Sequence, residues 1–420
     1  MLHAAAKTLG HETLAPLNSK VFAVIWASTF LSNVSVTVLA VGAVWHIATI
    51  DGKADVVALV QAVTLFPIFL LGLVAGGLAD ILDRRRLVIT AQLVMATSSA
   101  GLALGLWLGV LSPSLVFALI FLLGCGAAFR LPAYQASIGT FVPKEQIAAA
   151  VSLINMQFSV SRALGPVVGG ILVEAFGAQG AFVGALALNL CALGTLTIWP
   201  AGHAAIHKTL SDVADSITAG LRYVAGSTSV VALLSDTALI CFMGSALWAL
   251  LPVIVKDVFR GSAFDYGISL AFLGAGAVIG TIVVVRLQAL FERGRLLAAT
   301  CMVCGLSSFF VPLTSDERAR WLVLALAGAA WMAGLSVLVT TAQTCCPTEL
   351  RGRVVATYYM IYHAGLAAGS WFWGVFAKDL GIAEATEFAG ISLIVVGVII
   401  RARAQRGGTD NVDTGVAAGG

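Results

Sequence analysis

Residues 72–87 read Gly72-Leu-Val-Ala-Gly-Gly-Leu-Ala-Asp-Ile-Leu-Asp-Arg-Arg-Arg-Leu87, a charged turn between two long apolar runs. Five charged residues fall within positions 80–86, and apolar sequence resumes directly after them. This pattern predicts a hairpin between two membrane spans. Three consecutive arginines do not readily cross a bilayer, so we expect this loop on the cytoplasmic side.

The composition supports a membrane protein. Hydrophobic residues make up 59% of the 420 residues, charged residues only 11%, and the mean hydropathy is +0.98. Soluble globular proteins carry roughly a quarter of charged residues. We therefore expect an all-α integral membrane protein in a lipid bilayer. The net charge of +3 is small and the bases are spread over loops, so we expect no nucleic-acid partner.

Apolar runs separated by polar turns predict twelve membrane spans. Each run has roughly 18 to 28 residues, enough to cross ~30 Å of hydrocarbon at about 1.5 Å per residue. The runs lie near residues 21–47, 55–79, 87–110, 114–139, 147–175, 180–200, 229–255, 266–290, 296–313, 320–345, 353–377 and 384–401.

The distribution of bases sets the expected topology. With both termini in the cytoplasm, most of the 24 lysines and arginines fall in cytoplasmic segments. We expect a cytoplasmic tail (1–20), a six-helix bundle (21–200), a cytoplasmic linker (201–228) containing an amphipathic surface helix, a second six-helix bundle (229–401) and a disordered cytoplasmic tail (402–420).

The two halves look like repeats of one plan. At an offset of about 204 residues, Val-Pro143-Lys-Glu matches Cys-Pro347-Thr-Glu. At an offset of about 209, Asp-Arg84 matches Glu-Arg293. Internal repeats of this kind are common in transporters.

Neither an enzyme nor a metal site is indicated. Cys301-x-x-Cys304 has the spacing of a metal or redox motif, but it lies in an apolar helix without a second ligand pair. We interpret both residues as small buried hydrophobic groups. Catalytic and phosphate-binding motifs are missing from the sequence, so we expect no cofactor and no enzymatic activity.

The loop at residues 72–87 closely resembles the signature between helices 2 and 3 of the major facilitator superfamily. The matching residues are Gly76, Asp80, Arg84 and Arg86. The resemblance implies two six-helix bundles related by a pseudo-twofold axis, which rock about a central site. It also implies that this loop acts as a conformational latch between the halves.

The fifth predicted span contains a second signature. Gly165, Pro166, Gly169 and Gly170 resemble the Gly-Pro-x-x-Gly-Gly pattern of exporters in this superfamily, although Ser161 stands where a further glycine is expected. The proline removes a backbone hydrogen bond and permits a bend. A close-packed kink without a role in export explains the same pattern.

Charged residues within spans are candidates for the substrate and proton pathway, because burying them in a membrane is costly. These are Arg130, Arg162 and Asp236. In the fold that the chain resembles, helices 1, 4, 7 and 10 line the cavity, which implies roles for Arg130, Asp236 and Asn33 of span 1. We hypothesise that Asp236 exchanges a proton during transport. The alternative is a static Asp–Arg pair that aids packing.

Three further residues complete the candidate pathway. Trp248 and Trp331 lie on predicted cavity helices and are candidates for stacking on a substrate. His363 is a candidate because histidine side chains ordinarily gain and lose a proton near neutral pH. A lone histidine in a helix is, however, more often a hydrogen-bonded packing residue.

The residues Asn33, Asp80, Arg162 and the run Glu349-Leu-Arg-Gly-Arg resemble the branch that holds macrolide-efflux and enterobactin-export proteins. That branch implies a monomeric, proton-coupled exporter of an amphipathic small molecule in the bacterial inner membrane. A proton-coupled importer and a non-transporting sensor or assembly partner are the alternatives.

Overall fold

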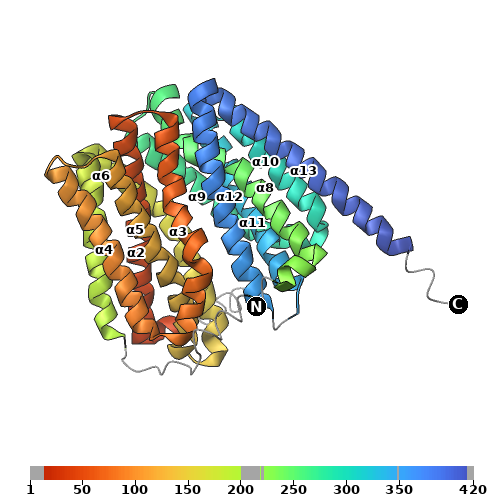
Figure 1. The fold of residues 1–420 in the computed structure, drawn as a ribbon, viewed down its shortest axis with the longest axis horizontal. Helices are drawn as coiled ribbons and strands as arrows, with labels where there is room; N and C mark the ends of the chain where they lie inside the picture. The colour runs from red at the N-terminus through yellow and green to blue at the C-terminus, as the bar shows by residue number, and fades with distance from the viewer. Residues whose placement is uncertain (1–13, 200–217, 219–221, 348–349, 414–420) are drawn as a thin grey trace, which may run out of the picture. The chain divides into compact units, whose positions relative to one another are not determined.

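The computed structural model describes residues 14–199, 218, 222–347 and 350–413, and every regular element in those ranges is a helix (Figure 1). The predicted amphipathic helix of the linker lies largely outside the described residues. So do most of the N-terminal tail and the end of the C-terminal tail.

The described residues of the N-terminal half form five long helices. They are α2 (Lys20–Ile50), α3 (Ala54–Ile81), α4 (Arg84–Trp107), α5 (Pro113–Ser137) and α6 (Ile147–Thr195), with short 3-10 turns at Ala15–Asn18, Ile138–Thr140, Lys144–Gln146 and Leu196–Ile198. Helix α6 is two segments that meet at Gly177, which has φ 66° and ψ −172°. A positive φ favours glycine, so this residue turns the chain between the fifth and sixth predicted spans.

The described residues of the C-terminal half form six long helices. They are α8 (Thr228–Val253), α9 (Ala263–Leu290), α10 (Arg293–Phe310), α11 (Glu317–Thr344), α12 (Arg351–Leu380) and α13 (Ile382–Asp413), and a π-helical turn (Ile254–Val258) extends α8.

The prediction of twelve spans agrees with these helices. Nine helices in the described part of the chain are long and apolar enough to cross a membrane, and the one that includes α6 covers both of its segments. With those segments counted separately, and with α10 and α12 added, twelve long helices correspond to the twelve predicted spans.

The last helix is longer than predicted. We expected the final span to end at 401 and a disordered tail to follow, whereas α13 continues to Asp413 (Figure 1). Residues 402–406 read Ala-Arg-Ala-Gln-Arg, and all of these residue types have high helix propensity. The helix therefore extends beyond the apolar run that hydropathy detects.

Polar side chains start several of the helices. Ser19, Ser112 and Ser227 each accept a hydrogen bond from a backbone N–H of the first turn, which satisfies a donor that the helix leaves open. The repeat-matched residues Arg84 and Arg293 are the first residues of α4 and α10. The predicted sequence repeat therefore coincides with equivalent helix starts.

The chain divides into two compact units. Unit 1 comprises Met1–Asp51, Val63–Leu221 and Gly261–Ala271, and unit 2 comprises Gly52–Ala62, Arg222–Arg260 and Phe272–Gly420. The division differs from the predicted bundles, since the beginning of α3 belongs to unit 2 and the beginning of α9 belongs to unit 1.

Close backbone packing accounts for both exchanges. In unit 1, a Cβ at Gly170 of α6 would lie 2.9 Å from the carbonyl oxygen of Ala263, the first residue of α9. In unit 2, a Cβ at Gly374 of α12 would lie 2.5 Å from Cβ of Ala58 in α3. Gly170 and Gly374 also match each other at the repeat offset of about 204 residues. Small residues at such positions let helices approach closely.

Glycines also bring helices together within unit 2. A Cβ at Gly276 or Gly280 of α9 would overlap backbone carbonyls of α11, and a Cβ at Gly328 of α11 would overlap one of α9. Gly276 and Gly280 lie four residues apart on α9, a spacing of small residues that is common where membrane helices pack closely.

Candidate functional site

In unit 1, two residues that were each predicted to belong to the pathway, Asn33 and Arg130, lie side by side. The Arg130 Nη2 atom donates a 2.7 Å hydrogen bond to Oδ1 of Asn33, which joins α5 to α2. Arg130 is only 5% exposed. Two of the residues predicted to line the pathway are therefore in contact, in a site where an unpaired charge is costly.

A second buried polar network joins side chains of α2, α4 and α6, and its members are hydrogen-bonded to one another. Ser32 donates to Gln92 Oε1 at 2.9 Å, Gln92 Nε2 donates to Asn189 Oδ1 at 2.7 Å, and Asn189 Nδ2 donates to Ser99 at 2.9 Å. These bonds connect α2, α4 and the second segment of α6. The network satisfies its members and stabilises the bundle.

Asp236 of α8 forms ion pairs with two arginines of unit 2. Its Oδ2 atom lies 3.3 Å from Nη2 of Arg293, the first residue of α10, and its Oδ1 atom lies 4.0 Å from Nη1 of Arg403 in α13. The carboxylate thus connects α8 to the first residue of α10 and to the C-terminal part of α13, and Arg403 belongs to the segment predicted to be disordered.

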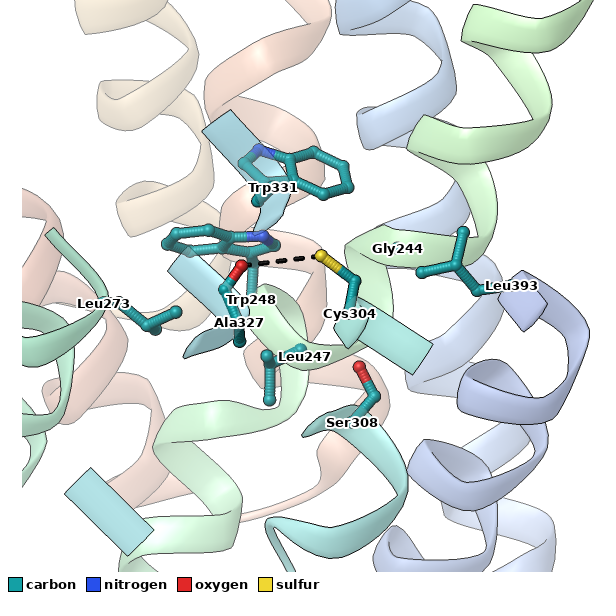
Figure 2. Close-up of a pocket in the computed structure, with 9 residues that line it drawn as sticks. All are labelled: Gly244, Leu247, Trp248, Leu273, Cys304, Ser308, Ala327, Trp331 and Leu393. Atoms are coloured by element: carbon teal, nitrogen blue, oxygen red, sulfur yellow. Dashed lines mark hydrogen bonds between the residues drawn. The ribbon is translucent and has the colours of Figure 1, made fainter. Parts of the chain in front are cut away.

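Trp248 and Trp331 lie together in unit 2. Their ring centroids are 6.3 Å apart, and both side chains line a small cavity between α8, α9, α10, α11 and α13 (Figure 2). Leu273, Cys304 and Ser308 also line this cavity. Its free space amounts to about one water molecule, so in this conformation the indoles contact each other and leave no room for a larger ligand.

The other two pathway candidates stand apart from these clusters. Arg162 is exposed on α6, one residue after the buried Ser161. The Nδ1 atom of His363 lies 2.7 Å from the carbonyl oxygen of Tyr359 in its own helix, and its ring packs edge-on against Tyr362. His363 thus makes the local contacts expected of a packing residue.

Two arginines of the predicted latch loop, Arg84 and Arg86, make hydrogen bonds that order the loop. Arg84 donates to the carbonyl oxygens of Ala79 at 3.2 Å and Ala136 at 2.7 Å, which ties the loop to the end of α5. The backbone N–H of Arg86 donates to Asp83 at 3.1 Å. A Cβ at Gly76 would meet no atom within 4 Å. The side chain of Asp80 lies outside the described structure.

The glycines of the predicted kink pack against α2. A Cβ at Gly165 would overlap the side chain of Thr37, and one at Gly169 would lie 3.0 Å from Cβ of Val41. Pro166 lies between these glycines inside α6. Helix α6 packs closely along α2, and its glycines allow this approach.

Several residues with buried polar groups or ion-pair contacts were not among the predicted pathway residues. Tyr134, Gln157 and Ser161 are buried in unit 1 and carry polar atoms without a hydrogen-bond partner in the described structure. The spacing of four between Gln157, Ser161 and Gly165 was the available signal. Arg403 had no signal beyond its charge, and Arg293 had its charge and its match to Arg84 in the internal repeat.

Comparisons with known proteins identify the family. The family described as transmembrane secretion effector matches residues 11–414. Macrolide efflux protein A of Streptococcus pyogenes is 22% identical over 392 residues, which covers 90% of this chain and 94% of that protein. Enterobactin exporter EntS of Shigella flexneri is 25% identical over 395 residues, which covers 90% of each chain.

Solved structures agree on the fold. A crystal structure of a mutant of the nucleoside transporter NupG superposes with a TM-score of 0.77 at 11% identity, over 91% of this chain and 99% of that one. No group of three or more potential metal-ligating side chains occurs within the described ranges. The chain is a membrane transporter and not an enzyme, and it belongs to the transmembrane secretion effector family of the major facilitator superfamily.

Proposed function

We propose that this protein exports an amphipathic small molecule from the bacterial cytoplasm in exchange for protons. Transport proceeds by alternating access, with both termini and the loop at residues 80–86 on the cytoplasmic side of the inner membrane. The protein works as a monomer.

The family assignment over residues 11–414 is the observation that carries this proposal. Two relatives that extend over nine-tenths of the chain are named as efflux and export proteins. Their names differ in cargo, macrolides and enterobactin, so the direction of transport has more support than any individual substrate. A fold alone does not set direction.

Asp236 is the proposed site of proton coupling. The carboxylate is the one acid deep in a predicted span, it is 7% exposed, and two arginines hold it. A proton added to the carboxylate removes its negative charge and so weakens its attraction to Arg293 and Arg403. Loss of that proton restores the pair. This two-state contact can bias the conformation of unit 2.

The glycine contacts support a conformational cycle. The ends of α3 and α12 proposed to lie on the outer side are in close contact at Gly374, and Asp55 and Lys378 form an ion pair there at 2.9 Å. On the proposed cytoplasmic side, Gly76 has open space around it. We propose that the outer contact opens and the Gly76 loop closes as the cargo leaves.

Proton movement in everted vesicles tests the proposal. In these vesicles the cytoplasmic face points outward, so an added substrate meets the side from which export starts. With a pH dye in the lumen and no imposed gradient, a substrate that enters in exchange for protons makes the lumen alkaline. A symporter carries protons in with the substrate and makes the lumen acidic.

Two matched variants define the controls. Asp236→Asn is expected to abolish the substrate-dependent pH change, whereas Glu174→Gln, which neutralises an exposed carboxylate of α6, is expected to retain it. Acidification of the lumen would overturn export. An intact proton response in Asp236→Asn would overturn the coupling role of this residue.

A further inference from the structure

A buried arginine without an acidic partner lies in unit 1. Arg130 is nine-tenths buried or more, and its one hydrogen bond to a described residue goes to the neutral amide oxygen of Asn33. Within the described ranges, no carboxylate pairs with Arg130, and its Nε atom has no partner. A buried cation normally pairs with an anion, because desolvation is otherwise uncompensated.

A face of α6 brings further polar groups to this region. Leu153, Gln157, Ser161 and Gly165 follow at intervals of four residues and share one side of the helix. Trp26 Nε1 donates to the Leu153 carbonyl oxygen at 3.1 Å, so α2 contacts the start of this face.

Helix α2 also contacts the end of the same face. A Cβ at Gly165 would overlap the side chain of Thr37. The side chains at 157 and 161 therefore lie between two contacts with α2. Asn33 follows Trp26 by seven residues and precedes Thr37 by four, so it lies on the side of α2 that faces α6.

Helix α5 also places polar side chains beside α2, at the heights of Asn33 and of Thr29. Arg130 meets Asn33, and Tyr134, one turn farther along α5, neighbours Thr29, which is one turn before Asn33 on α2. The opposite directions of the two helices explain this match. Three helices thus present polar side chains to one small region at two successive levels.

Five side chains of this region carry polar atoms without a partner among the described residues. The atoms are Asn33 Nδ2, Arg130 Nε, the Tyr134 hydroxyl, the Gln157 amide and the Ser161 hydroxyl. Each side chain belongs to a buried residue, and Gln157, Ser161 and Tyr134 are each 1% exposed. Orphaned buried donors are costly, and here all five residues can donate.

We propose that these five residues form an anion site that binds an acid group, such as a carboxylate, on the exported molecule. The guanidinium of Arg130 supplies the countercharge, and the hydroxyl and amide donors bind the remaining oxygen lone pairs. The Gln157 carbonyl oxygen accepts an N–H or O–H beside the acid. This assignment rests on the proposed export function and narrows the cargo to acidic amphipathic molecules.

A matched pair of probes tests the site on the purified full-length protein. The probes are 2-naphthoate and its neutral amide, which share an aromatic ring and differ in charge. Binding is measured by thermal stabilisation as a function of probe concentration. We expect wild-type protein to bind the acid about 10- to 100-fold more tightly, because charge-assisted hydrogen bonds contribute the difference.

Substitutions show which residues cause the preference for the acid over the amide. Arg130→Gln is expected to remove it, and Ser161→Ala to weaken binding of the acid several-fold. Lys20→Gln, which removes an exposed charge at the start of α2, is the matched control and should retain the preference. Because Arg130→Gln can fail to fold, Asn33→Asp provides a second test.

The Asn33→Asp variant supplies Arg130 with an internal carboxylate at the position of the present 2.7 Å hydrogen bond. It should raise the thermal stability of the ligand-free protein and lower its affinity for 2-naphthoate at least tenfold. Selective binding of the acid that survives in Asn33→Asp would overturn the site.

The outcomes separate this inference from the export proposal. Equal binding of acid and amide to wild-type protein overturns the anion site, even if everted vesicles show proton-coupled flux. Selective, Arg130-dependent binding supports the site, and a failure of the vesicle assay would then count against export alone.

Discussion

Asp236→Asn is expected to remove an ion pair that joins α8 to α10. The Asp236 and Arg293 side chains are 3.3 Å apart, and two unit charges at that distance attract by about 5 kcal/mol at an effective dielectric constant of about 20. The Arg293 side chain is 38% exposed, so solvent screening reduces the expected coupling to about 1–2 kcal/mol. Arg403 lies at 4.0 Å and is 62% exposed, and we expect its coupling to be less than about 0.5 kcal/mol.

A double-mutant cycle measures this coupling. The free energy of unfolding is determined in mixed micelles for Asp236→Asn, Arg293→Gln and the double variant. The cycle isolates the interaction between the two side chains from the effects of each substitution alone. A parallel cycle with Arg403→Gln gives the weaker coupling, and Arg295→Gln, a substitution on the same turn of α10, serves as the control.

The structural reasoning predicts an order as well as a size. Arg293 should couple to Asp236 more strongly than Arg403 does, and Arg295 should not couple. A coupling between Asp236 and Arg293 that is zero within error would refute the ion pair. If Asp236 coupled more strongly to Arg403 than to Arg293, the distances from Asp236 to these two arginines would be wrong.

Three further substitutions test packing and conformational change. Gly328→Leu should lower the free energy of unfolding by about 1–3 kcal/mol, because the Cβ of the new side chain would overlap a backbone carbonyl of α9. Gly226→Leu, whose Cβ meets nothing within 4 Å, is the control, and equal stability of the two variants would argue against this packing. Gly76→Leu should leave the thermal midpoint of unfolding unchanged but abolish transport in reconstituted vesicles, since the site is open in this conformation and closes in the proposed cycle. Full transport by this variant would contradict the latch. Asp55→Asn should lower the free energy of unfolding by less than about 1 kcal/mol, because the Lys378 side chain is 51% exposed, and a larger loss in chemical denaturation would mean that the pair is better shielded than the structure indicates.

The arrangement of membrane helices was largely predictable from the sequence. Long apolar runs and charged turns depend on composition, which the bilayer imposes on each span separately. The turn at Gly177 also follows from the sequence, because a glycine stands between two apolar runs. The continuation of α13 past 401 was not predicted, since hydropathy detects apolar character and not helix propensity.

The partners of the charged residues were harder to predict. Arg130 and Asn33 were both assigned to the pathway, but their direct hydrogen bond depends on the rotation of α5 against α2. Asp236 was expected to have an arginine partner, yet Arg293 and Arg403 come from two other helices and are distant in sequence. Such pairs depend on the packing of whole helices.

The buried polar groups of α6 escaped prediction for a different reason. Gln157 and Ser161 are small or neutral, and such residues are common in membrane helices without a special role. Their role in the proposed anion site rests on polar atoms that have no partner among the described residues, which a sequence pattern does not reveal.

The most direct test of alternating access uses the contact between α3 and α12. In a background without the seven native cysteines, Asp55→Cys and Lys378→Cys are introduced together and bridged with a short cleavable crosslinker. The account predicts that crosslinking stops transport, that cleavage of the crosslinker restores it, and that the single-cysteine variants treated alike remain active. Full transport by the crosslinked protein would contradict the account, because this contact would then not need to open.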